Sequence, residues 1–108
     1  MTKHAAVRTA TEYLRLVQKS GIHLEQAYLF GSQALGTARP DSDIDLCVVS
    51  ADFSQDRQGE RVRLMNLRND QTDMVEPHPV RSDDFDDQLN FFAIEVKRTG
   101  VSLLPKRG

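Results

Sequence analysis

Cysteine is nearly absent from this sequence, which has Cys47 alone among its 108 residues. A single thiol excludes an internal disulfide framework and a zinc site built from several cysteines. Long apolar runs are also missing. No stretch approaches the roughly 20 apolar residues of a membrane helix, and the N-terminus lacks the apolar core of a secretory signal. We therefore expect a cytoplasmic protein with no membrane-spanning segment.

An excess of charge of either sign is missing too. The chain has 14 Lys and Arg against 16 Asp and Glu, a net charge of −2 at pH 7. Proteins that hold nucleic acid through its phosphates need clustered positive charge, so we expect no direct nucleic-acid binding. A chain of this length has room for one packed core, and we expect a single domain over residues 1–108. Its function must then lie in a local site.

The apolar positions follow helical and strand periods in turn along the chain. Three stretches have apolar residues at steps of three and four, as helices do: 3–20, 55–69 and 82–100. Four shorter stretches are apolar throughout or alternate, as strands do: 27–30, 43–49, 72–76 and 101–104. Pro77 and Pro79 are expected to end the third strand, and a short helix is expected between the first two. This order predicts an α+β fold, with a small mixed sheet of about four strands and helices packed against it.

The last helix has the clearest local signals. Ser82 is a candidate N-cap, and Gly100 is the expected stop. Between them an apolar stripe advances by four, three and four residues: Phe85, Leu89, Phe92 and Val96. The sequence therefore predicts one continuous helix with a buried face.

The stretch from Gly31 to Gly36 has the chemistry of a phosphate-binding turn. Gly31 and Ser32 follow a short apolar strand. A glycine there lets the backbone turn sharply and lets a ligand approach the amides closely. Ser32 would begin a short helix, where free N–H groups and the helix dipole favour an anion. A plain strand end and a serine N-cap require the same residues, so the stretch indicates phosphate only in combination with the acidic residues after it.

Two aspartates lie on the next predicted strand. Asp43 and Asp45 are two residues apart, so their side chains project from one face of that strand. Close carboxylates repel each other unless a cation lies between them, and all-oxygen donors suit Mg²⁺. Asp73 is a candidate third carboxylate, because its short strand could pair beside theirs. The alternatives are a solvated strand face for Asp43 and Asp45 and a strand-edge acid for Asp73.

Together, G-S-x-x-x-G at 31–36 and S-D-I-D-L at 42–46 resemble the signature of the polymerase-β nucleotidyltransferase superfamily. The compact length is similar to that of its minimal nucleotidyltransferase domains, which include the antitoxin partners of HEPN-domain ribonucleases. The resemblance is dense over 30–49 and extends more loosely to residue 100. It implies the nucleotidyltransferase fold.

The resemblance also implies roles for individual residues. Gly31 and Ser32 match the turn that binds the nucleotide triphosphate. Asp43 and Asp45 match the two catalytic acids that bind Mg²⁺. Asp73 is similar in placement to the third catalytic, metal-binding acid, which is often assigned the activation of the acceptor hydroxyl.

Transfer of AMP from ATP to a hydroxyl group is the activity that the resemblance implies. The expected acceptor is a tyrosine of a partner HEPN toxin, so that the chain acts as an antitoxin within a hetero-oligomer. Many relatives have basic residues inside the G-S-x-x-x-G stretch, whereas Gln33 and Leu35 are neutral. That difference leaves open a second interpretation, an antitoxin that neutralises its partner by binding alone. A third is a small-molecule adenylyltransferase.

The remaining polar and reactive residues are expected to be structural. Cys47 is expected in the core, and the acidic residues at 83–87 complement, in part, the positive start of a helix. Four arginines of the helix at 55–69 are expected on a solvated face or against an acidic acceptor or partner: Arg57, Arg61, Arg63 and Arg68.

Overall fold

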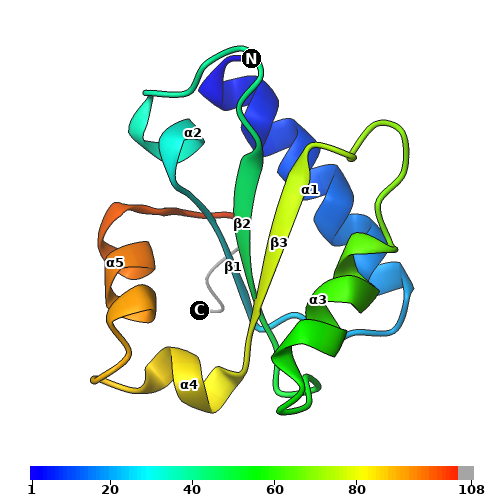
Figure 1. The fold of residues 1–108 in the computed structure, drawn as a ribbon, viewed down its shortest axis with the longest axis vertical. Coiled ribbons are helices and arrows are strands. Elements are labelled where there is room, and N and C mark those ends of the chain that lie inside the picture. The colour runs from blue at the N-terminus through cyan, green and yellow to red at the C-terminus, as the bar shows by residue number, and fades with distance from the viewer. Residues whose placement is uncertain (105–108) are drawn as a thin grey trace.

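Helices and strands alternate along the chain in the expected order, apart from one helix that is divided in two (Figure 1). The computed structural model describes residues 1–104. Its helices are α1 (Lys3–Lys19), α2 (Ser32–Leu35), α3 (Arg57–Met65), α4 (Ser82–Asp86) and α5 (Phe91–Thr99). Its strands are β1 (Gln26–Phe30), β2 (Ile44–Val49), β3 (Val75–Val80) and β4 (Val101–Ser102). The expected fold class is confirmed. No helix within these residues is long and apolar enough to span a bilayer.

The strands form one mixed sheet in the order β3-β2-β1-β4. Strands β1 and β2 run antiparallel, and Phe30 at the end of β1 pairs with Asp45. Strands β2 and β3 run parallel, with Ile44 beside Val75 and Asp45 beside Glu76. The end of β1 and the starts of β2 and β3 therefore meet at one end of the sheet.

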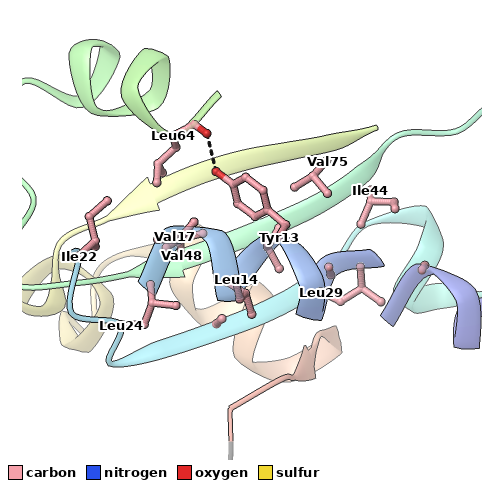
Figure 2. Close-up of a cluster of buried hydrophobic side chains, with 14 of the residues drawn as sticks. Tyr13, Leu14, Val17, Ile22, Leu24, Leu29, Ile44, Val48, Leu64 and Val75 are labelled. Carbon is pink, nitrogen blue, oxygen red and sulfur yellow. Dashed lines mark hydrogen bonds between the residues drawn. The ribbon is translucent and has the colours of Figure 1, made fainter. Parts of the chain in front are cut away.

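Helices α1 and α3 cover one face of the sheet (Figure 1). Strand residues that point into this layer include Leu29, Leu46 and Val75, all fully buried. Figure 2 shows Tyr13 of α1 in this core, where its hydroxyl donates a 2.6 Å hydrogen bond to the Leu64 carbonyl. The bond joins α1 to α3 and satisfies two polar groups inside an apolar layer.

Helices α4 and α5 cover part of the opposite face. Cys47 and Val49 of β2 are buried there against Phe85 of α4 and Val96 of α5. Asp45 lies two residues before Cys47 and projects from this same face, but its side chain stays 35% exposed. The start of β2 is thus a part of this face that remains open to solvent.

Strand β3 begins three residues later than expected, so the prediction of a strand at 72–76 is wrong, and Pro77 and Pro79 lie inside the strand. The Met74 carbonyl points toward β2, where it accepts a hydrogen bond from the Ile44 N–H. Successive strand residues point their main-chain groups in opposite directions, so the odd-numbered prolines face the outer edge of the sheet. Proline costs no ladder hydrogen bond at that edge.

The single helix expected at 82–100 is also wrong, because this segment forms the two helices α4 and α5. The backbone is extended at Asp87, turns over residues 88–89 and is extended again at Asn90. The Asn90 side chain then accepts a hydrogen bond from the Ala93 N–H and caps α5. Leu89, expected in the buried stripe, lies in the connection and is exposed.

Three further expectations about where elements begin or end differ from the structure, besides shifts of one residue at α1, β1 and β2. Ser82 is not the N-cap of α4, because Arg81 occupies that position. The third helix is shorter than the expected range of 55–69, because Asp56 caps its first turn. Strand β4 covers two residues of the expected 101–104.

Candidate active site

Gly31 places the turn after β1 directly against Asp45. Its φ is +74°, a left-handed conformation that glycine adopts without strain. A Cβ atom on this residue would lie only 2.6 Å from Asp45 Oδ2. The strand register explains the contact, since Phe30 pairs with Asp45. The glycine–serine turn and one acid of the D-x-D pair therefore lie side by side.

Helix α2 is a single turn that begins at Ser32. Gln33 in this helix is buried, and its side-chain amide donates a 3.3 Å hydrogen bond to the Ser42 carbonyl. Ser42 immediately precedes Asp43. The neutral Gln33 thus has a structural role, because it ties the turn that follows β1 to the loop that leads into the two aspartates.

Asp45 is the second residue of β2, whereas Asp43 lies outside the strand, so the expectation that both acids are on one strand is wrong for Asp43. Asp43 lies just before the strand and is exposed. Asp45 lies within the strand, and its two oxygens have different neighbours. Oδ1 is 3.3 Å from His78 Nε2, whereas Oδ2 is the atom closest to Gly31.

Asp73 lies in the turn before β3, where its side chain is exposed. Its carbonyl accepts a 3.0 Å hydrogen bond from the Arg68 guanidinium. The acid beside Asp45 in the sheet register is Glu76. Among residues 1–104, no group of three or more His, Cys, Asp or Glu side chains could hold a metal ion by itself. The convergence of Asp73 with Asp43 and Asp45 therefore stays a prediction.

Glu76 and His78 are candidate site residues that the local sequence patterns do not identify. Both project from the face that carries Asp45, because Glu76 pairs with Asp45 and His78 pairs with Cys47. Glu76 Oε2 accepts a 2.9 Å hydrogen bond from Arg61. The alternation in V-E-P-H-P-V at 75–80 is the signal for both residues, but it is visible only if prolines are allowed inside a strand.

Aromatic rings border Asp45 on the side of α5. The rings of Phe30 and His78 pack edge to face with centroids 5.1 Å apart. Phe92 of α5 packs edge-on against Phe30 at 5.3 Å. These contacts hold the imidazole beside Asp45 and give the site an apolar border.

Cys47 follows Asp45 by two residues on the same face, but it takes no part in the site. It is fully buried, and burial raises the pKa of its thiol to about 12. A thiol with such a pKa is protonated at neutral pH and is a poor nucleophile. This observation agrees with the structural role expected for Cys47.

Two of the four arginines expected on a helix at 55–69 have specific partners on or beside β3, and one of them, Arg68, lies after the end of α3. Arg61 pairs with Glu76, and Arg68 donates to the carbonyls of Asp73 and Val75 at the outer edge of the sheet. The four arginines therefore do not all lie on a solvated face, because Arg61 and Arg68 help to hold β3 in place.

The donor set of Asp43 and Asp45 fits a magnesium ion. In phosphate-transferring sites, Mg²⁺ usually takes one or two carboxylates and completes its octahedron with water and substrate oxygens. Asp43 is exposed, the Asp45 side chain is 35% exposed, and no side chain at Gly31 crowds Asp45 Oδ2. These two residues could hold the ion, and a bound Mg²⁺ would polarise a phosphate oxygen and stabilise its developing charge.

Comparisons with known proteins agree with this geometry. Residues 12–97 match the nucleotidyltransferase domain family. Among solved structures, a candidate nucleotidyltransferase of Sulfolobus solfataricus has the same fold, with a TM-score of 0.65 and 22% sequence identity. That match covers 93% of this chain and 80% of the other. A search of curated proteins gave no match. Since the family match spans most of the described residues, including the turn at Gly31 and both acids of the D-x-D pair, the chain belongs to the nucleotidyltransferase domain family.

Proposed function

We propose that this chain transfers AMP from ATP to the hydroxyl group of an acceptor, in a reaction that requires Mg²⁺. The observation that carries this proposal is the contact between Gly31 and Asp45, because it sets the glycine–serine turn, whose amides would bind phosphate, beside an acid that would bind the metal. Membership of the nucleotidyltransferase family supports the reaction class. The proposed acceptor is a tyrosine of a partner HEPN-domain toxin, which makes the chain an antitoxin within a hetero-oligomer.

In this reaction the acceptor oxygen forms a bond to the α-phosphorus of ATP while the bond from that phosphorus to the bridging oxygen breaks. Pyrophosphate leaves with the bonding electron pair, and the acceptor proton passes to a carboxylate of the site or to water. Backbone amides at Gly31 and Ser32 would hold phosphate oxygens, and Asp43 and Asp45 would hold the metal. Bound Mg²⁺ would offset the phosphate charge and orient the α-phosphate. His78 orients Asp45 through its contact with Oδ1.

Incubation with α-labelled ATP and Mg²⁺, with and without a HEPN-domain protein encoded beside this chain, tests the proposal. We expect the wild-type chain to label the partner. Asp43→Asn and Asp45→Asn should each reduce labelling roughly 100-fold or more, because each removes a charged metal ligand. Asp70→Asn, at an exposed turn outside the site, is the matched control. Wild-type labelling by Asp45→Asn would show that the chemistry lies elsewhere.

The same assay identifies the third acid. Asp73→Asn and Glu76→Gln, made separately, compare the acid expected from the family pattern with the acid that lies beside Asp45 in the sheet. The variant that loses labelling marks the carboxylate that works with Asp43 and Asp45. Full labelling by both variants would mean that two carboxylates suffice.

A second candidate function is neutralisation of the partner by binding alone. Buried Gln33 and exposed Leu35 favour it, because neither brings a cation to the triphosphate. A stable complex without transfer of label would support this function in place of AMP transfer. Label on a small molecule would instead support a small-molecule adenylyltransferase.

A further inference from the structure

Large apolar side chains are exposed where α4 connects to α5. Leu89 is 79% exposed, Phe91 is 80% exposed and Ile94 is 41% exposed. Phe91 and Ile94 are three residues apart on α5 and so share one side of the helix, and Leu89 lies just before them. We call these three residues the α5 patch. Contiguous apolar side chains at the surface often mark a site of interaction with another protein.

Phe92 connects the α5 patch to the candidate active site. Its ring centroid lies 5.3 Å from that of Phe30 and 6.3 Å from that of His78, and His78 contacts Asp45. Phe92 and Asn90 also line a hollow of about 460 Å³ between α3, the end of β3 and the α4–α5 connection. A protein docked on the α5 patch would therefore adjoin this hollow and the aromatic residues that border Asp45.

The surface around the α5 patch is acidic. Residues 82–99 contain five acidic and two basic side chains, and with Arg81, which pairs with Asp83, the net charge of this segment is −2. Asp86 and Asp87, beside the patch, are exposed. One of these cations, Lys97, is occupied by a hydrogen bond to the Phe85 carbonyl. A second copy of this chain docked through the same segment would bring like charge against the patch, and nucleic acid would do the same. The complementary occupant is a protein surface that is apolar at its centre and rich in Lys and Arg at its rim.

We propose that the α5 patch docks the acceptor protein through such a basic-rimmed apolar surface. The inference rests on the proposed function, because it names the surface that holds the protein whose hydroxyl is modified. Exposed Phe91 would act as the anchor, since aromatic side chains supply a large part of the binding energy in protein interfaces. Docking there would position the acceptor beside the catalytic face, because the patch adjoins the border formed by Phe92.

The dissociation constant of the complex with the HEPN-domain protein tests this proposal independently of label transfer. Phe91→Ser and Leu89→Ser should each weaken the complex at least tenfold, and the wild-type complex should weaken as salt is raised. Val62→Ser is the matched control, because Val62 is 51% exposed on α3, away from the patch. None of these variants should lower the melting temperature much, since each removed side chain is mainly solvated.

Several outcomes would overturn the docking surface: unchanged affinity for Phe91→Ser, weakened affinity for Val62→Ser, or no complex with the wild-type chain. Self-association of the chain that is lost in Phe91→Ser would assign the patch to a second copy instead. Asp45→Asn should bind the partner as tightly as wild type. If the wild-type chain transfers no label but Phe91→Ser still weakens the complex, the proposed reaction fails and the docking surface stands. If Phe91→Ser binds the partner and labels it normally, the docking surface fails and the proposed reaction stands.

Discussion

The contact between Gly31 and Asp45 is the smallest feature on which the site depends. A side chain at position 31 would meet Asp45 Oδ2 at 2.6 Å, and the left-handed φ of +74° would add strain. Gly36, at the other end of α2, has nearly the same φ of +75°, but nothing lies within 4 Å of a Cβ added there. Their ψ values differ, −153° at Gly31 and 18° at Gly36, so Gly36 is a left-handed helical position that alanine can occupy at modest cost, whereas Gly31 combines a glycine-only conformation with crowding of the carboxylate.

Gly36→Ala should lower the free energy of unfolding by about 1–2 kcal/mol, because alanine disfavours a left-handed φ. Gly31→Ala should lower it by more, because its ψ of −153° is also unfavourable for alanine and its Cβ would meet Asp45. Only Gly31→Ala should also displace Asp45 and reduce AMP transfer, to at least roughly tenfold below the rate of Gly36→Ala. Urea unfolding and label-transfer rates measure the two effects. Equal transfer rates in the two variants would mean that the close approach to Asp45 is not needed.

Sequence alone identifies part of the site at this scale. Gly31, Asp43 and Asp45 are recognisable because a turn residue and a strand alternation are local patterns. Glu76 and His78 are not recognisable, since their place on the face of the sheet that carries Asp45 depends on the register of β3 against β2. That register depends on packing between segments some 30 residues apart in the sequence.

At the scale of elements, Asn90 determines how the C-terminal segment is divided. Its Oδ1 accepts a hydrogen bond from the Ala93 N–H, and its Nδ2 donates one of 2.9 Å to the Asp84 carbonyl. One side chain thus starts α5 and holds the end of α4. Periodicity predicts a continuous helix here, because Phe85 and Leu89 are spaced as in a helix, but it does not detect a capping residue within the stripe.

Asn90→Ala should lower the free energy of unfolding by about 1–2 kcal/mol, because it removes a helix cap and leaves the Asp84 carbonyl without this partner. Gln88→Ala, an exposed position in the same connection, should change it by less than about 0.5 kcal/mol. Thermal unfolding followed by circular dichroism measures both variants. An Asn90→Ala chain as stable as wild type would mean that α4 and α5 are held by packing alone.

At the scale of the whole molecule, the site lies where the second helical layer stops. Helices α1 and α3 cover one face of the sheet, whereas α4 and α5 leave the start of β2 open on the other (Figure 1). The sequence predicts four strands and their alternation with helices, because these follow local periods. It does not predict the strand order or which helix covers which face, because those depend on contacts between distant segments.

Cys47, buried at the centre of the sheet, reports on unfolding of the whole domain. Burial raises the pKa of its thiol from an ordinary value of 9.0 to about 12. Between these values the folded chain keeps a proton that the unfolded chain releases, so stability should fall as pH rises from 9 toward 12. At pH 8, a thiol reagent should label the urea-unfolded chain rapidly and the native chain only as fast as it unfolds. Rapid labelling of the native chain would contradict the burial of β2.

The central claim is that Asp43, Asp45 and the turn at Gly31 together form a magnesium–nucleotide site. Amide NMR spectra of the chain, titrated with Mg²⁺ and a non-hydrolysable ATP analogue, test it without any acceptor. We expect metal-dependent amide shifts at Gly31, Ser32 and the first residues of β2, and we expect Asp45→Asn to lose these shifts. Identical shifts in Asp45→Asn, or shifts confined to another surface, would contradict it.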